Sequence, residues 1–83
     1  MAYSLSFSAS AVKKLEKINE PYYSKIKNAI LDLTVDPRPP GCKKLKGRDG
    51  YRIRVGSFRV IYDVFDTELI VDVITLGHRK EIY

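Results

Sequence analysis

The pattern of apolar positions predicts a strand followed by two helices in the first 33 residues. Residues 3–7 alternate apolar and polar side chains, as in a strand with one buried face. In the two segments that follow, apolar residues recur every three or four positions, which predicts two amphipathic helices. These positions are Val12, Leu15 and Ile18 in the first segment and Tyr22, Ile26, Ile30 and Leu33 in the second. Ser8 or Ser10 can cap the first helix, and Pro21 suits the first turn of the second, so we expect a helical hairpin.

Residues 36–41 contain three prolines and a glycine, which ends the helical pattern. Beyond this break the apolar period changes to two. In residues 51–55 the apolar side chains point one way, while Arg52 and Arg54 point the other way. Gly56 and Ser57 are typical of a two-residue hairpin turn.

The remaining apolar segments predict two more strands. Residues 58–65 are apolar at nearly every position, as in a central strand, and Asp66 with Thr67 marks the next turn. Residues 68–76 predict the last strand, which we expect Gly77 to end. The element order predicts an α+β fold in which an N-terminal strand and a helical hairpin accompany a small, mainly antiparallel sheet of four to five strands. The helices would pack on one sheet face and leave the other free for function.

Composition narrows the class of protein. A chain of 83 residues, 45% of them hydrophobic, predicts one domain spanning residues 1–83, without a large ligand cavity. The single cysteine, Cys42, excludes an internal disulfide. We find no secretory signal and no apolar run long enough to span a bilayer, so we expect a cytoplasmic protein that does not bind membranes. No cluster at metal-ligand spacing appears, and we expect neither a metal nor a cofactor.

The positive charge is concentrated in one part of the chain. The whole sequence carries a net charge of +5, but residues 43–59 alone hold seven basic residues and one acidic residue, a net charge of +6. Residues 60–76 hold four acidic residues and no basic one. A basic sector of this kind indicates an acidic partner, either nucleic acid or an acidic protein.

Strand alternation gathers three arginines of this sector. Arg52 and Arg54 share one face of their strand, and a two-residue turn would place Arg54 opposite Arg59 in the next strand. Like charges placed opposite each other destabilise a sheet, unless an anion lies between them, and the arginine fork suits phosphate. An ordinary solvated basic face explains the pattern about equally well.

A metal-free ribonuclease is the chemistry that these residues could support. RNA supplies its own nucleophile, the 2′-OH, and the protein must align it, move protons and stabilise the charged phosphate. Arginines can stabilise the charge, while a tyrosine, lysine or histidine could move the proton. The candidates include His78 and Tyr83, although such terminal residues are more often structural or incidental.

Several phrases of the chain resemble the RelE family of toxin–antitoxin toxins. They occur in the same order across nearly the whole sequence: residues 3–7 before a lysine-rich helix, 37–47, 51–56, 58–62 and 77–83. The ordered set is specific to the wider RelE/ParE superfamily. The resemblance implies a ribosome-dependent, metal-independent endoribonuclease that cuts messenger RNA in the ribosomal A site. It also implies a cognate RelB-like antitoxin, with the ribosome, its messenger RNA and ribosomal RNA as the other partners.

Carried over position by position, the resemblance assigns roles to individual residues. The catalytic set that it implies is Arg52, Arg54, Arg59, Arg79 and Tyr83. Lys44, Lys46 and Arg48 match the part of the family that approaches ribosomal RNA, and Lys43 and His78 complete the RNA-binding set. Arginine cannot act as a base, so a reaction that needs a lysine on this strand would have to use Lys44 or Lys46.

Three other functions remain open at the level of sequence. A ParE-like toxin on the same fold would inhibit DNA gyrase and would not need the arginines and Tyr83 together. A non-catalytic RNA-binding protein would bind RNA without cleaving it. A degenerate toxin would bind only its antitoxin.

Overall fold

The computed structural model describes residues 2–78. Along the chain these form β1 (Ser4–Phe7), α1 (Ala9–Glu16), α2 (Tyr22–Asp32), β2 (Lys43–Lys44), β3 (Tyr51–Val55), β4 (Phe58–Phe65) and β5 (Ile70–His78). The strands make one five-stranded sheet in the order β1-β5-β4-β3-β2. β1 runs parallel to β5, and every other pair is antiparallel. The expected α+β fold with a mainly antiparallel sheet is confirmed, and β4 is its central strand.

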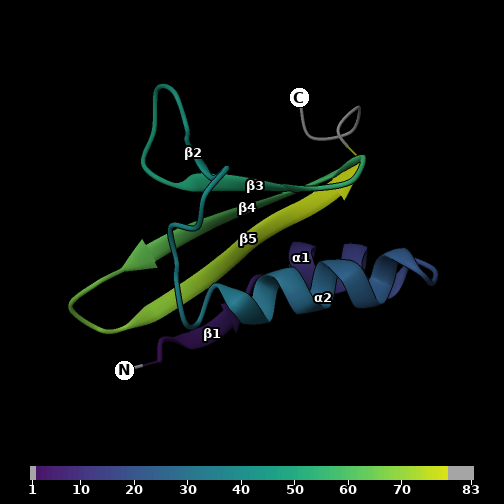
Figure 1. The fold of residues 1–83 in the computed structure, drawn as a ribbon, viewed down its shortest axis with the longest axis horizontal. Helices are drawn as coiled ribbons and strands as arrows, with labels where there is room; N and C mark the ends of the chain where they lie inside the picture. The colour runs from purple at the N-terminus through teal and green to yellow at the C-terminus, as the bar shows by residue number, and fades with distance from the viewer. Residues whose placement is uncertain (1, 79–83) are drawn as a thin grey trace.

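Both helices lie on one face of the sheet, and the core lies between the two layers (Figure 1). The buried helical residues Ile26 and Ile30, with Leu33 directly after α2, match the predicted apolar stripe. The sheet contributes the other large buried side chains, which are Val60, Tyr62, Val71, Val73 and Leu76. We call the face of the sheet away from the helices the open face. None of the helices within residues 2–78 is long and apolar enough to cross a membrane.

Leu15 and Ile18 of the first predicted stripe pack against the core, but Val12 does not. Ala11 is fully buried, whereas Val12 is 42% exposed. Ser8, rather than Ser10, caps α1, because its side chain accepts a hydrogen bond from the backbone N–H of Ala11. The small Ala11 side chain allows α1 to approach the sheet closely, so the predicted place of Val12 in the core was wrong.

Two other expectations need correction at the ends of elements. Pro21 caps the second helix, which begins one residue later, and Tyr22 is 47% exposed rather than packed in the core. Gly77 does not end the last strand. β5 continues through Gly77 to His78, because these residues pair with Arg59 and Phe58 of β4 and keep the ladder intact.

Candidate nucleic-acid interface

The strand register assembles the three predicted arginines on the open face. Arg54 is the Cα partner of Arg59, which in turn pairs with Gly77. Arg52 is the partner of Ile61, which pairs with Thr75. Directly paired residues of antiparallel strands lie on the same face. The open face therefore carries two adjacent rows, one of Arg54, Arg59 and Gly77 and one of Arg52, Ile61 and Thr75.

Burial and neighbouring residues explain how this face can receive an anion. Arg54 is exposed, and Arg52 and Arg59 are partly buried. The residue beside Arg59 on β5 is Gly77, which has no side chain to cover the row. Farther along the same face, Asp63 is paired with Asp72. The open face thus has a basic end and an acidic end, as the charge distribution along the sequence predicts.

A shallow hollow adjoins the arginine rows. It has a volume of about 600 Å³, and we call it the basic hollow. Its lining residues are Lys43, Lys44, Leu45, Lys46, Arg48, Arg52, Ile61 and Thr75. Five of these are basic and none is acidic, which suits a phosphate backbone. The hollow brings the four RNA-binding residues predicted between positions 43 and 48 together with Arg52.

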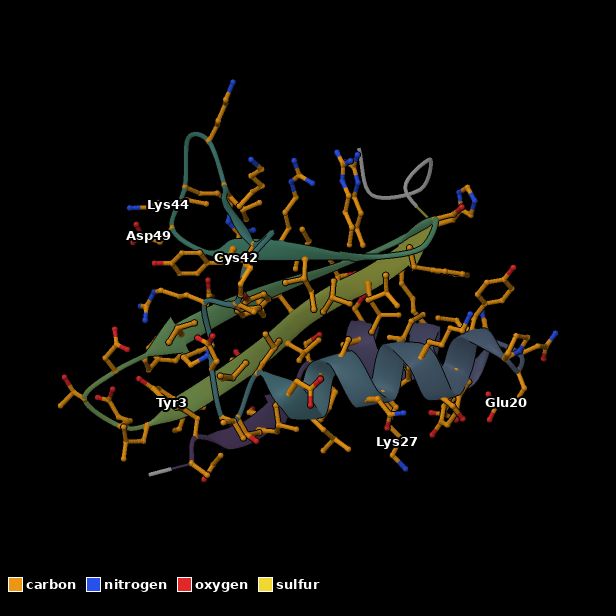
Figure 2. All side chains as sticks on the ribbon, in the orientation of Figure 1. Tyr3, Glu20, Lys27, Cys42, Lys44 and Asp49 are labelled. Carbon is orange, nitrogen blue, oxygen red and sulfur yellow. The ribbon has the colours of Figure 1, made fainter. Side chains whose placement is uncertain are left out.

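The loop between β2 and β3 forms one wall of this hollow and rises from the side of the sheet away from the helices (Figure 2). The backbone N–H of Leu45 donates to the carbonyl oxygen of Gly50 at 3.0 Å, which closes the loop. Gly50 has a φ of +123°, and a Cβ added there would lie 2.8 Å from Oδ1 of Asp63. The guanidinium of Arg48 lies 3.9 Å from the same carboxylate oxygen. These contacts hold the basic loop against β4.

Register also separates the two lysines of β2. Lys43 pairs with Arg52, whereas Lys44 pairs with Tyr51, which lies on the other face of β3. The lysine directly beside the arginine rows is therefore Lys43. Lys44 and Lys46, the lysines that the sequence expectation named as a possible base, line the basic hollow with Arg52, and their role stays a prediction. The pairing of Lys43 with Arg52 could not be predicted, because the register of a two-residue strand cannot be read from its sequence.

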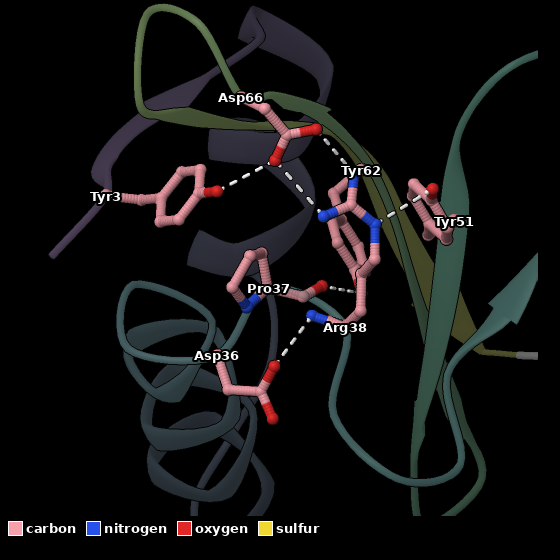
Figure 3. A network of polar contacts seen from close by, with 7 residues as sticks. All are labelled: Tyr3, Asp36, Pro37, Arg38, Tyr51, Tyr62 and Asp66. Atoms are coloured by element: carbon pink, nitrogen blue, oxygen red, sulfur yellow. Dashed lines mark hydrogen bonds and ion pairs between the residues drawn. The ribbon is translucent and has the colours of Figure 1, made fainter. Parts of the chain in front are cut away.

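A network that sequence reasoning missed fixes the segment before β2 (Figure 3). Arg38 donates two hydrogen bonds to the carboxylate of Asp66, at 2.9 and 3.2 Å, and a third from Nε to the hydroxyl of Tyr51 at 3.0 Å. The hydroxyl of Tyr3 donates to Asp66 at 2.8 Å. The hydrogen bonds that Arg38 and Tyr3 donate to Asp66 lower the pKa of its carboxyl group. The hydrogen bonds that Arg38 donates to Asp66 and Tyr51 raise the pKa of the guanidinium.

The same segment is held by a buried hydrogen bond. Tyr62 is fully buried, and its hydroxyl donates to the carbonyl oxygen of Pro37 at 2.7 Å. Burial is the main cause that raises the pKa of this tyrosine. Together, Arg38 and Tyr62 attach residues 37–38 to the sheet just before the basic strand β2. We call this set of contacts the Arg38 network.

His78 lies on a different surface from the arginines. It pairs with Phe58, and the two rings meet edge to face with centroids 5.8 Å apart. Phe58 is on the helix side of the sheet, so His78 is separated from the basic hollow by the sheet itself. Arg79 and Tyr83 lie outside the described residues, and their roles stay predictions. Within residues 2–78, no group of three or more His, Cys, Asp or Glu side chains gathers as a metal site would require.

Sequence comparison gives the family. A family model described as "ParE toxin of type II toxin-antitoxin system, parDE" matches residues 5–83. The "mRNA interferase toxin RelE" of Escherichia coli (strain K12) is 33% identical over 88 aligned positions, covering 100% of this chain and 92% of the relative. The chain belongs to the RelE family of type II toxins.

Solved structures of RelE proteins have the same fold. The RelE–RelB complex from Pyrococcus horikoshii OT3 contains a chain with a TM-score of 0.84 and 28% identity, with 95% of this chain and 97% of that chain covered. The intact RelBE toxin–antitoxin complex of Escherichia coli gives a TM-score of 0.82 and 31% identity, with coverage of 93% and 96%. In both complexes the RelE-like chain was solved with RelB.

Proposed function

We propose that this RelE-family protein is a ribosome-dependent endoribonuclease that cuts messenger RNA in the ribosomal A site. The observation that carries the proposal is the placement of Arg52, Arg54 and Arg59 in adjacent rows of the open face, beside the basic hollow. The name of the Escherichia coli relative, mRNA interferase toxin, supports the same activity.

In the proposed reaction the 2′-oxygen of the substrate attacks the neighbouring phosphorus atom. A base takes the 2′-hydroxyl proton, and an acid protonates the departing 5′-oxygen. The products are a 2′,3′-cyclic phosphate and a free 5′-hydroxyl. Arg54 and Arg59 would bind the phosphate and stabilise the charge that develops on it. Because guanidinium groups cannot accept a proton, the base must be another residue.

Lys43 is one candidate base, because it is the Cα partner of Arg52 on the neighbouring strand. Tyr83 remains the candidate that the resemblance implies, with Arg79 as a phosphate stabiliser or proton donor. The open face is shallow and cannot enclose a flexible RNA strand by itself. A ribosome that holds the message in a fixed path would supply the alignment that this face lacks.

We also propose a RelB-like antitoxin as the partner that neutralises the toxin. The RelE–RelB complexes of related proteins support this assignment. The net charge of +6 over residues 43–59 would favour an acidic antitoxin segment that covers the open face. Such a cover would block both the arginine rows and the basic hollow.

The test uses purified ribosomes programmed with a defined messenger RNA. We expect cleavage within the A-site codon, 2′,3′-cyclic phosphate ends and no cleavage of the same RNA without ribosomes. An Arg54→Ala variant should cut at least about ten-fold more slowly, because it loses a contact to the charged phosphate. Lys27→Ala, which removes one charge from the exposed side of α2, is the control. Binding without cleavage would contradict the proposal and indicate an RNA-binding protein.

Inhibition of DNA gyrase is a second candidate function, because the description of the matching family model names ParE toxins. A ParE-like protein would inhibit DNA gyrase and leave messenger RNA intact. A supercoiling assay with purified gyrase separates the two functions. We expect no inhibition by the wild-type protein, whereas inhibition that survives Arg54→Ala would support the ParE-like function.

A further inference from the structure

A second hollow lies at the end of the sheet, on the side that carries the helices. It has a volume of about 440 Å³ and is lined by the end of α1, the start of α2 and the paired ends of β4 and β5. We call it the end hollow. Its lining includes Lys14, Lys17, Glu20, Tyr22, Phe58 and His78. The end hollow is separate from the basic hollow, because no residue of the 43–48 segment lines it.

Three aromatic rings meet in the end hollow. The ring centroids of Tyr22 and Phe58 are 5.5 Å apart, and those of Phe58 and His78 are 5.8 Å apart. Tyr22 is nevertheless 47% exposed, although its position in the sequence predicts a core residue. Its phenol is therefore supported from one side by Phe58 and still accessible to solvent. A supported and accessible aromatic ring is a surface on which a nucleobase can stack.

The charge of the end hollow suits a phosphate. Lys14 and Lys17 are both in its wall, and Glu20 is the only acidic residue that lines it among residues 2–78. The carboxylate of Glu20 is engaged elsewhere, because it accepts hydrogen bonds from the backbone N–H and the hydroxyl of Ser24 at 3.0 and 2.6 Å. These hydrogen bonds lower the pKa of Glu20. In the described part of the chain, neither Lys14 nor Lys17 therefore forms an ion pair with a carboxylate.

The end hollow adjoins the arginine rows around the end of the sheet. The row of Phe58 and His78 directly follows the row of Arg59 and Gly77 in the β4–β5 ladder, and the two rows lie on opposite faces. Successive residues of a strand are only about 3.3 Å apart along its axis. A chain of nucleotides that leaves the arginine rows at this end of the sheet reaches the end hollow when it turns around the sheet end.

We propose that the end hollow is a second RNA subsite, which takes one unpaired nucleotide of single-stranded RNA. Its base stacks on Tyr22, and Lys14 and Lys17 bind the flanking phosphates. The inference rests on the proposed action on RNA and adds a contact outside the arginine rows. Such a subsite would hold the RNA at two places and so fix the direction in which the strand crosses the open face.

The test measures binding of full-length protein to a fluorescently labelled 2′-O-methyl oligouridine of 12 nucleotides. This probe lacks the 2′-hydroxyl nucleophile, so it stays intact during the titration. We expect Tyr22→Ala to weaken binding by about ten-fold, as loss of one stacked base does, and Tyr22→Phe to retain the wild-type affinity. Lys14→Ala combined with Lys17→Ala should reduce the slope of log affinity against log salt by about 1.4, since each phosphate contact contributes about 0.7.

The charge-matched control is Lys25→Ala combined with Lys27→Ala, two exposed lysines of α2 that are not in the end hollow. Lys27 points away from the sheet (Figure 2). We expect this control to leave the salt slope unchanged. Wild-type affinity in Tyr22→Ala, or equal slopes in the two lysine pairs, would overturn the subsite. The ribosomal cleavage assay tests the proposed cleavage activity separately. The results for the RNA subsite and for cleavage can therefore be told apart.

Discussion

Arg54 and Arg59 are Cα partners in the β3–β4 ladder, next to the hairpin turn, so that two positive side chains stand side by side on the open face. Like charges placed opposite each other destabilise a sheet. A charged residue opposite a neutral one at these two positions would avoid this repulsion and give a more stable hairpin. The arrangement fits a site that binds an anion.

The first prediction separates stability from function at this pair. Replacing Arg54 with Gln removes the repulsion and keeps a polar side chain on the strand. We expect the free energy of unfolding to stay constant or rise by up to about 1 kcal/mol in urea denaturation at low salt. Cleavage on programmed ribosomes should fall in the same variant. A variant that is clearly less stable would show that Arg54 supports the fold rather than the ligand.

The second prediction concerns the shape of the basic loop. In Gly50→Ala the new Cβ would lie 2.8 Å from the Asp63 carboxylate, at a φ of +123°. We expect a loss of about 1–3 kcal/mol in unfolding free energy and weaker RNA binding, because the loop must move. Gly47→Ala is the matched control, since its φ is +77° but no atom lies within 4 Å of the added Cβ. Equal RNA affinities in the two variants would contradict the role of loop shape.

The third prediction concerns the buried hydrogen bond between the Tyr62 hydroxyl and the Pro37 carbonyl oxygen. Tyr62→Phe leaves the carbonyl oxygen of Pro37 without its hydrogen bond in a buried place. We expect a loss of about 1–3 kcal/mol in the free energy of unfolding, measured by urea denaturation. Tyr3→Phe, which removes a hydroxyl from an exposed hydrogen bond to Asp66, should cost less. The opposite ranking of the two variants would contradict this account of the Arg38 network.

The fourth prediction follows from the lowered pKa of Asp66, whose ordinary value is 3.8. A carboxylate with a depressed pKa in the folded state adds stability above its unfolded pKa, and this contribution disappears as the pH falls through the folded pKa. Wild-type protein should therefore be more stable than Asp66→Asn at neutral pH. The difference in unfolding free energy should shrink below about pH 4, as measured by denaturation across pH. A difference that is constant down to pH 2 would mean that the charge of Asp66 does not stabilise the fold.

The sequence was sufficient for the features that depend on local spacing. A two-residue turn at Gly56 and Ser57 determines the pairing of the residues on both sides, so the opposition of Arg54 and Arg59 could be predicted and is confirmed. The helical stripe that contains Ile26 and Ile30 was likewise read from its period. In both cases the residues of one short segment are enough to determine the structural feature.

The features that were missed depend on residues far apart in the chain. Arg38 and Asp66 are 28 positions apart, and neither the proline-rich segment nor the turn indicates that they meet. Leu15 and Ile18 pack against the core as predicted, but Ala11 takes the place expected for Val12, because close packing against the sheet favours the smaller side chain. The end hollow was missed for the same reason, since Lys17, Tyr22 and His78 come together only when the hairpin packs on the sheet.

The most direct test of the central claim is primer extension on a translated reporter message after induction of the toxin in cells. We expect discrete breaks within codons for the wild-type chain and for Lys27→Ala. We expect no breaks for a variant that combines Arg54→Ala with Arg59→Ala, and none when translation initiation is blocked. Growth arrest with an intact message, or equal breaks in the double arginine variant, would contradict the proposed ribosome-dependent cleavage.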